Sequence, residues 1–106
     1  MDWKVYIVKC SDKTFYTGIT NNIKLRLDTH NAGNGAKYTK NRLPVVLVYL
    51  ESVDDKSNAL KREMEIKKLN RSQKIDLINT TNHSTTYAFI ILIDYHRLTR
   101  SYRSLR

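Results

Sequence analysis

The chain has 106 residues with 19 Lys or Arg against 10 Asp or Glu, so its formal net charge is +9, which favours polyanionic partners such as nucleic acid. That length suits one domain, and an apolar content of 41% is enough for a hydrophobic core, which argues against wholesale disorder. The longest apolar run, residues 88–93, is far shorter than the roughly 20 residues of a membrane helix, so an integral membrane protein is excluded. A single cysteine, Cys10, is typical of a protein of the reducing cytoplasm.

Two β-strands joined by a three-residue turn are predicted at the N-terminus. In residues 3–10, which are rich in β-branched and aromatic side chains, Trp3, Val5 and Ile7 alternate with Lys4, Tyr6 and Val8 in the manner of a strand. Residues 14–19 form a second β-favouring run. With this turn length Tyr6 lies opposite Gly18, and Tyr6 and Tyr16 project from the same face of the hairpin. The missing side chain of Gly18 would then leave space between the strands.

A helix capped by Asn21 or Asn22 is expected to continue to about His30. Arg26 and His30, four residues apart, border its apolar stripe. Residues 31–43 contain two glycines and predict a flexible cationic loop. The basic and aromatic residues of this loop are Lys37, Tyr38, Lys40 and Arg42.

The second half of the predicted domain holds one more strand and two more helices. Residues 45–50 are continuously apolar, which indicates a buried strand. A helix is expected to begin near Asp54, Asp55 or Ser57, each a suitable N-cap, and to end at about Leu69. Ser72 is expected to cap a short last helix that ends at Ile78.

Glu63 is the acidic residue whose position needs an explanation. On a helical wheel it falls in the middle of the face expected to point inward, beside Lys67, whereas Glu65 falls on the solvent side. A carboxylate on a buried face has to be paired, protonated or bound to a ligand, because its desolvation is costly. The apolar residues that define this inward face are Ala59, Leu60, Met64 and Ile66.

We predict a domain over residues 1–79 and an appended segment over residues 80–106, made of a polar linker, a short apolar stretch and a basic tail. The domain carries a net charge of +6 and the appended segment +3. Residues 87–93 would add an edge strand, pack on the domain as a helix, or bind a partner. The arginines beyond them would follow phosphates or form a frayed cationic end: Arg97, Arg100, Arg103 and Arg106.

Five ordered motifs in this domain resemble the GIY-YIG nuclease superfamily, in particular its small stand-alone members. Val5-Tyr6-Ile7 and Tyr16-Thr17-Gly18 resemble the paired motif in a conservative variant, and Arg26 with His30 matches its Arg-x-x-x-His helix. The remaining resemblances are the loop residues Asn31, Gly33, Gly35, Ala36, Lys37, Tyr38 and Thr39, and the helix residues Ala59, Leu60, Glu63, Ile66 and Lys67.

This resemblance implies a small α+β fold, with a three-stranded, mainly antiparallel sheet flanked by helices. It also implies an endonuclease that uses one divalent cation, Mg²⁺ or Mn²⁺, and water to displace the 3′ oxygen at a DNA phosphate. Glu63 would bind the metal, Arg26 would neutralise phosphoryl charge, and Tyr6 would be the general base. Tyr16 and His30, with Tyr38, would position water and phosphate.

The implied partner is DNA, branched or damaged DNA included, and no membrane is expected. The residues assigned to DNA contact are Gly18, Lys37, Tyr38, Lys40, Arg42 and Lys67.

Each of these residues also has a purely structural interpretation. Tyr6 and Tyr16 would be cross-strand core residues, Arg26 would edge its helix, and Glu63 with Lys67 would form an ion pair. A nucleic-acid-binding module that keeps the fold without cutting is the main alternative function. A protein-interaction domain, suggested by the apolar stretch near the C-terminus, is a third.

Overall fold

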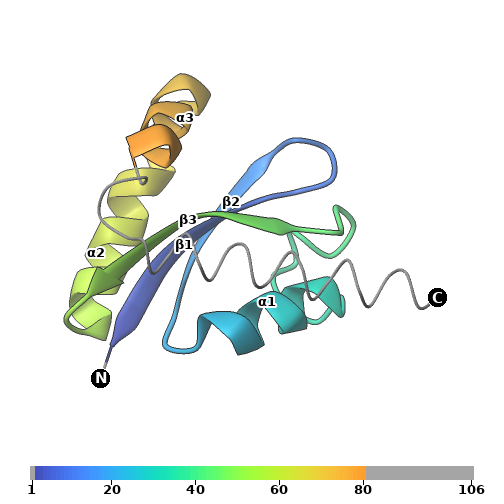
Figure 1. Ribbon diagram of the computed structural model, residues 1–106, viewed down its shortest axis with the longest axis horizontal. Helices are drawn as coiled ribbons and strands as arrows, with labels where there is room; N and C mark the ends of the chain where they lie inside the picture. The colour runs from blue at the N-terminus through green and yellow to red at the C-terminus, as the bar shows by residue number, and fades with distance from the viewer. Residues whose placement is uncertain (1, 81–106) are drawn as a thin grey trace.

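The computed structural model describes residues 2–80 and contains three strands and three helices there, in the predicted order. No helix within this range is long and apolar enough to cross a membrane. The apolar stretch 87–93 and the basic tail lie outside the described residues, and the domain boundary after residue 79 stays a prediction. The elements are β1 (Trp3–Lys9), β2 (Phe15–Thr20), α1 (Ile23–Asn31), β3 (Val46–Val53), α2 (Lys56–Lys67) and α3 (Arg71–Asn79) (Figure 1).

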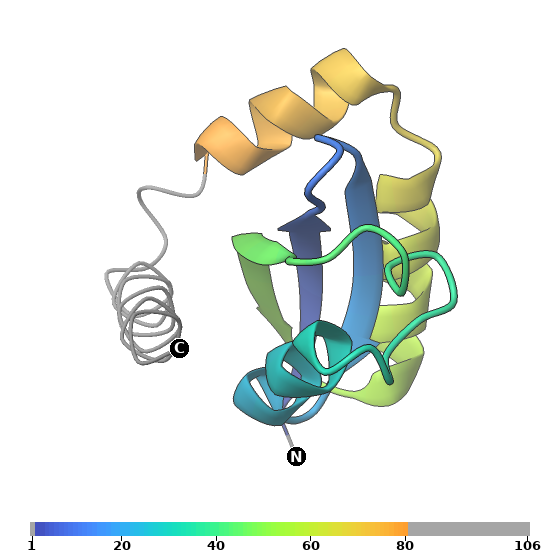
Figure 2. The same ribbon diagram turned by 90° about the vertical axis from the view of Figure 1, so that its right-hand side faces the viewer.

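The strands form one antiparallel sheet in the order β2-β1-β3, with β1 in the middle (Figure 2). Tyr6 pairs with Gly18, and the backbone N–H of Cys10 donates to the carbonyl of Thr14 at 2.8 Å. The predicted register of the hairpin is therefore confirmed. Because register decides which face each side chain occupies, this pairing places Tyr6 and Tyr16 on the same face of the sheet.

Helices cover both faces of the sheet, so the central strand is buried on both sides. Tyr6 and Val8 pack with Leu27 of α1 in one cluster, while Val5 and Ile7 contact a second cluster below α2. All four side chains of this β1 run are fully buried. This arrangement confirms the α+β class and explains why the strand is apolar without strict alternation. The α2 and α3 residues of the second cluster and its margin are Ala59, Ile66, Leu77 and Ile78.

Asparagine and aspartate side chains cap all three helices. Asn22 caps α1, as expected, and Asp55 caps α2. The prediction that Ser72 caps the last helix is wrong, because Asn70 accepts the backbone N–H of Gln73 at 2.8 Å. The Gln73 side chain returns a bond to the Asn70 N–H, which completes a capping box and starts α3 before Ser72.

The inward face of α2 is narrower than predicted. Ala59 and Ile66 are fully buried, but Leu60 and Met64 are 43% and 59% exposed. Only the stripe with Ala59 and Ile66 packs against the sheet, where it contacts Val5, Ile7 and Tyr49. The neighbouring apolar residues Leu60 and Met64 therefore remain in contact with solvent. Glu63 consequently lies at the border of the buried stripe instead of at its centre.

Gly18 is required by the close approach of Tyr6. A Cβ atom built at Gly18 would overlap the hydroxyl and the adjoining ring carbon of Tyr6, whose side chain is fully buried. The Tyr6 ring therefore crosses the backbone of β2 at the one position where no side chain stands in its way.

We expect Gly18→Ala to lower the free energy of unfolding by about 1–3 kcal/mol, because the added methyl forces a buried ring to move. Urea unfolding followed by circular dichroism measures this change. An unchanged unfolding midpoint would contradict the fully buried position of Tyr6.

Candidate active site

The hydroxyl of Tyr6 lies at the centre of the candidate site. It is 2.8 Å from Nε2 of His30 and accepts a hydrogen bond of 3.2 Å from Nε of Arg26. Both partners come from α1, where their spacing of four residues places them on one side of the helix above the sheet. The structure therefore brings together three of the predicted catalytic residues, from β1 and from α1.

The hydrogen bonds around His30 determine which ring nitrogen carries the proton. Nδ1 of His30 is 2.9 Å from the Thr39 hydroxyl, and that hydroxyl donates to the carbonyl of Ala36 at 3.0 Å. Because a hydroxyl has one proton, Nδ1 must be the donor to Thr39. Nε2 is then the unprotonated nitrogen of the neutral ring, and the Tyr6 hydroxyl donates to it.

Burial sets the pKa values of this pair. It raises the pKa of Tyr6 to about 12, opposed by the hydrogen bond and charge of Arg26 and aided by smaller effects of Tyr16 and Glu63. Burial also lowers the pKa of His30 to about 4, and the Arg26 charge adds to that effect. At neutral pH the tyrosine is therefore protonated and the histidine is a neutral acceptor for its proton.

Arg26 is a permanent cation beside this pair. Burial lowers its pKa, but hydrogen bonds and charge interactions with Tyr6 and Tyr16 outweigh burial and raise the pKa above its ordinary value. Its side chain is half-buried; Nε donates to the Tyr6 hydroxyl, and Tyr16 is a second hydrogen-bond partner, which together occupy fewer than its five N–H donors. The flat guanidinium thus keeps N–H donors that suit a phosphate group.

Tyr16 and Tyr38 extend the site toward the surface. The Tyr16 ring lies 6.5 Å from the ring of Tyr6 and 5.5 Å from that of His30, and Tyr38 stacks on Tyr16 at 6.0 Å. Tyr38 is exposed, whereas Tyr16 is half-buried. An aromatic path therefore connects the buried Tyr6 with the loop that precedes β3.

Glu63 lies on α2, which packs on the other face of the sheet from α1. Its carboxylate is 3.5 Å from Nζ of Lys67, and the two side chains are 16% and 51% exposed. The ion pair is therefore open to solvent on the lysine side, and the carboxylate is not sealed. Its negative charge makes a small contribution to the raised pKa of Tyr6.

Among residues 2–80, no group of three or more His, Cys, Asp or Glu side chains could hold a metal ion. A site that encloses a cation with protein ligands is thus not formed by this part of the chain. Mg²⁺, however, keeps several waters and binds through one or two carboxylates together with substrate phosphates. The lone, partly accessible carboxylate of Glu63 fits an ion that is shared with the substrate in this way. It does not fit an ion that needs several protein ligands.

Arg62 holds α2 in the orientation that presents Glu63. Its guanidinium forms an ion pair of 2.9 Å with Glu51 on β3, and Glu51 also accepts the hydroxyl of the buried Tyr49. On the helix, Arg62 and Glu63 border the buried stripe on opposite sides. The pair with Glu51 therefore resists rotation of the helix about its axis.

Two contributors to the site had no clear signal in the sequence. Thr39 is fully buried and orients His30, but the sequence assigned it no role beyond its place in the loop motif that carries the family resemblance. Arg62 is next to Lys61 and falls on the predicted solvent face, whereas the structure shows it half-buried. Its partner Glu51 lies on another element, so the wheel of α2 alone could not reveal the pair.

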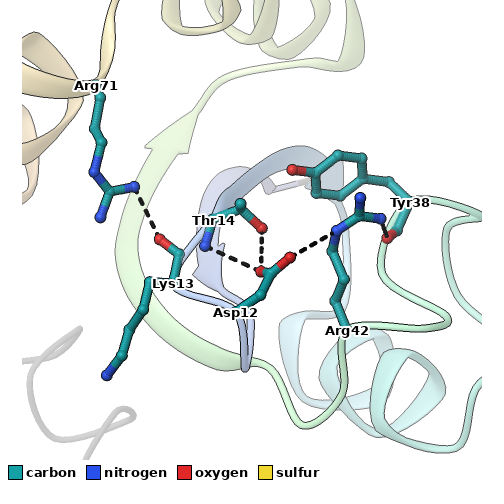
Figure 3. Close-up of polar contacts among 6 residues, drawn as sticks. All are labelled: Asp12, Lys13, Thr14, Tyr38, Arg42 and Arg71. Atoms are coloured by element: carbon teal, nitrogen blue, oxygen red, sulfur yellow. Dashed lines mark hydrogen bonds and ion pairs between the residues drawn. The ribbon is translucent and has the colours of Figure 1, made fainter.

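The residues assigned to DNA contact are dispersed. Lys37 and Lys40 lie exposed on the loop before β3. Arg42 is anchored on the same loop: its Nε is 3.0 Å from Asp12, NH1 donates to the Tyr38 carbonyl at 2.7 Å, and its guanidinium covers the Tyr38 ring (Figure 3). The other two assigned residues, Gly18 and Lys67, contact Tyr6 and Glu63.

Comparisons with known proteins agree with this architecture. The family model described as "GIY-YIG catalytic domain" matches residues 2–76. A UPF0213 protein of Staphylococcus haemolyticus is 60% identical over 74 residues, which is 70% of this chain and 90% of that protein. A UPF0213 protein of Halobacterium salinarum is 54% identical over 70 residues, covering 66% of this chain and 91% of the other. The names of these relatives state no reaction.

A solved structure has the same fold. The solution NMR structure of a protein from E. faecalis superposes with a TM-score of 0.57 at 36% sequence identity, covering 82% of this chain and 93% of that one.

The pKa of His30 makes stability depend on pH. In the unfolded chain histidine binds a proton near pH 6.5, whereas in the folded protein His30 binds it only near pH 4. Stability is therefore fully present above pH 6.5 and falls as the pH drops toward 4, by up to about 3 kcal/mol. We expect urea unfolding between pH 7 and 4.5 to show this loss in the wild type and a smaller one in His30→Gln. Parallel pH curves for the two proteins would contradict the burial of a neutral His30.

Proposed function

The chain belongs to the GIY-YIG family, and from that premise we propose that it is a divalent-metal-dependent endonuclease that hydrolyses phosphodiester bonds in DNA. The observation that carries the proposal is the Tyr6 hydroxyl, which donates to a neutral His30 and accepts from Arg26. A purely structural tyrosine needs one partner for its hydroxyl. This one has a proton acceptor and a cation, as expected of a group that relays a proton beside a phosphate.

The chemistry of these side chains suits a water-mediated cleavage. As the oxygen of a water molecule bonds to phosphorus, its proton passes to the Tyr6 oxygen while the Tyr6 proton passes to Nε2 of His30. The bond between phosphorus and the 3′ oxygen breaks, and that oxygen takes a proton from solvent. The imidazolium then returns its proton to the Tyr6 oxygen, its hydrogen-bond partner at 2.8 Å. Both side chains are fully buried, so water and substrate reach this pair when a neighbouring side chain, such as the half-buried Arg26, moves aside.

A bound phosphate would improve this relay. The positive charge of Arg26 is one of the two causes that lower the pKa of His30. A phosphate held by the free donors of Arg26 would offset that charge and make Nε2 a better proton acceptor. Arg26 would also neutralise the negative charge that develops on the phosphoryl oxygens.

Glu63 would hold a single Mg²⁺ or Mn²⁺, and when bound the cation would polarise the phosphate and stabilise the leaving oxygen. Lys67, at 3.5 Å from this carboxylate, is the group that has to move aside. Its side chain is half-exposed and flexible, so the displacement costs little.

DNA is the substrate that we propose, with branched and damaged forms among those to be tested. The formal charge of +9 supports a polyanion, and 15 of the 19 basic residues fall within residues 1–79.

The Glu63–Lys67 pair is also the observation that favours the competing function. A carboxylate already neutralised by lysine needs no metal, as in a module that binds nucleic acid without cutting it.

We expect Glu63→Gln, Tyr6→Phe and Arg26→Lys each to reduce Mg²⁺-dependent cleavage of DNA at least about 100-fold, since each removes a group that acts in the transition state. Gel assays on single-stranded, duplex and branched DNA measure the rates. Asp28→Asn serves as the control, because it removes one negative charge from the exposed face of α1.

Two results would contradict the proposal. Wild-type protein that binds these DNAs but cleaves none of them with Mg²⁺ or Mn²⁺ would support the binding module. Equal cleavage by wild type and Glu63→Gln would mean that the activity comes from a contaminant.

A further inference from the structure

Two arginines hold the β1–β2 turn from opposite sides. NH1 of Arg71, at the start of α3, donates to the carbonyl of Lys13 at 2.8 Å. Nε of Arg42, on the loop before β3, pairs with Asp12 at 3.0 Å (Figure 3). The turn is thus anchored by residues that are 30 and 58 positions distant in the sequence.

Both guanidinium groups lie against aromatic rings. Cζ of Arg42 is 4.1 Å from the ring centroid of Tyr38, and Cζ of Arg71 is 4.7 Å from that of Phe15. A stacked guanidinium has lost much of its side-chain freedom before any ligand arrives, which lowers the entropic cost of binding. Arginine has five N–H donors, and those not used in the turn remain available.

The positive charges around the turn exceed the negative ones. Among residues 2–80, Asp12 is the carboxylate that forms an ion pair with Lys13, Arg42 or Arg71, and it pairs with Arg42. Hydrogen bonds from Thr14, and then the interaction with Arg42, lower the pKa of Asp12, so this carboxylate is ionised and fully committed to its partners. Lys13 and Arg71 are exposed, and two uncompensated positive charges face the solvent.

The turn is connected to the candidate active site by ring contacts. Arg42 covers Tyr38, Tyr38 stacks on Tyr16 at 6.0 Å, and Tyr16 lies 6.5 Å from Tyr6. Successive phosphates of one B-DNA strand advance by about 3.4 Å along the helix axis. Because the rings of Tyr16 and Tyr38 separate Tyr6 from Arg42, a strand with one phosphate at Arg26 would bring different phosphates to the turn.

We propose that Lys13, Arg42 and Arg71 form a second phosphate-binding surface, the turn surface, which holds the DNA backbone beside the phosphate at the active site. This inference rests on the proposed DNA substrate. The turn surface contributes affinity and the position of the strand, and it takes no part in the chemical step, because it contacts phosphates other than the one that is cleaved.

The test measures DNA binding without cleavage. All proteins carry Glu63→Gln and are assayed in EDTA, and the dissociation constant of a fluorescent DNA, duplex and single-stranded, is measured over a range of NaCl concentrations. Arg71→Gln and Lys13→Gln should each weaken binding and reduce the slope of log Kd against log salt by about 1. Lys61→Gln, which removes one charge from the exposed side of α2, should leave the slope unchanged.

A conservative variant separates binding from folding. Arg71→Lys keeps the positive charge but loses the planar group that stacks on Phe15. It should therefore retain most of the salt slope of DNA binding, even if its melting temperature falls as much as that of Arg71→Gln. If Arg71→Gln lowers only the melting temperature and leaves the slope unchanged, the arginine merely fastens the turn and the proposal is overturned. The same conclusion follows if the Glu63→Gln protein binds neither DNA.

The outcomes are independent of catalysis. A reduced slope together with a wild type that does not cleave DNA would leave the turn surface standing and remove the nuclease. If the wild type cleaves DNA and the variants have unchanged salt slopes, the nuclease stands and the turn surface is overturned. Variants that bind DNA normally but no longer capture an acidic protein segment would assign the turn to a protein partner and overturn the proposal.

Discussion

The buried hydroxyl of Tyr6 is the constraint on which the rest of the candidate site depends. An unpaired hydroxyl in this position would cost free energy, so it has to find hydrogen-bond partners. His30 and Arg26 supply them from α1, and this sets the position of the helix over the sheet. Thr39 then orients the imidazole, and Gly18 has no side chain because the ring needs the space. Stability and proposed chemistry therefore rely on the same contacts.

The carboxylate of Glu63 is positioned separately from the Tyr6 cluster. It comes from a helix on the opposite face of the sheet, where Ala59 permits close packing and Arg62 is paired with Glu51. One border of the buried stripe of α2 carries Arg62, whose ion pair with Glu51 connects the helix to β3, and the other border carries Glu63. A lone carboxylate held in this way suits a cation that is shared with the substrate, since the protein supplies one ligand and the phosphate and water supply the others.

Local patterns predicted the fold well. Alternation and turn length are properties of neighbouring residues, so they gave the strands, the register that pairs Tyr6 with Gly18, and the helix with Arg26 and His30. The failures involve choices among nearby residues. Either Asn70 or Ser72 is chemically able to cap α3, and the side-chain bond back from Gln73 favours the former.

The sequence by itself determined the element order, the hairpin register and the spacing of Arg26 and His30, because these depend on residues close together in the chain. Only the tertiary structure decided which nitrogen of His30 faces Tyr6, how far Glu63 is buried, and that arginines from two distant segments hold the β1–β2 turn. These features depend on distances and on desolvation, which arise only when remote segments pack against one another.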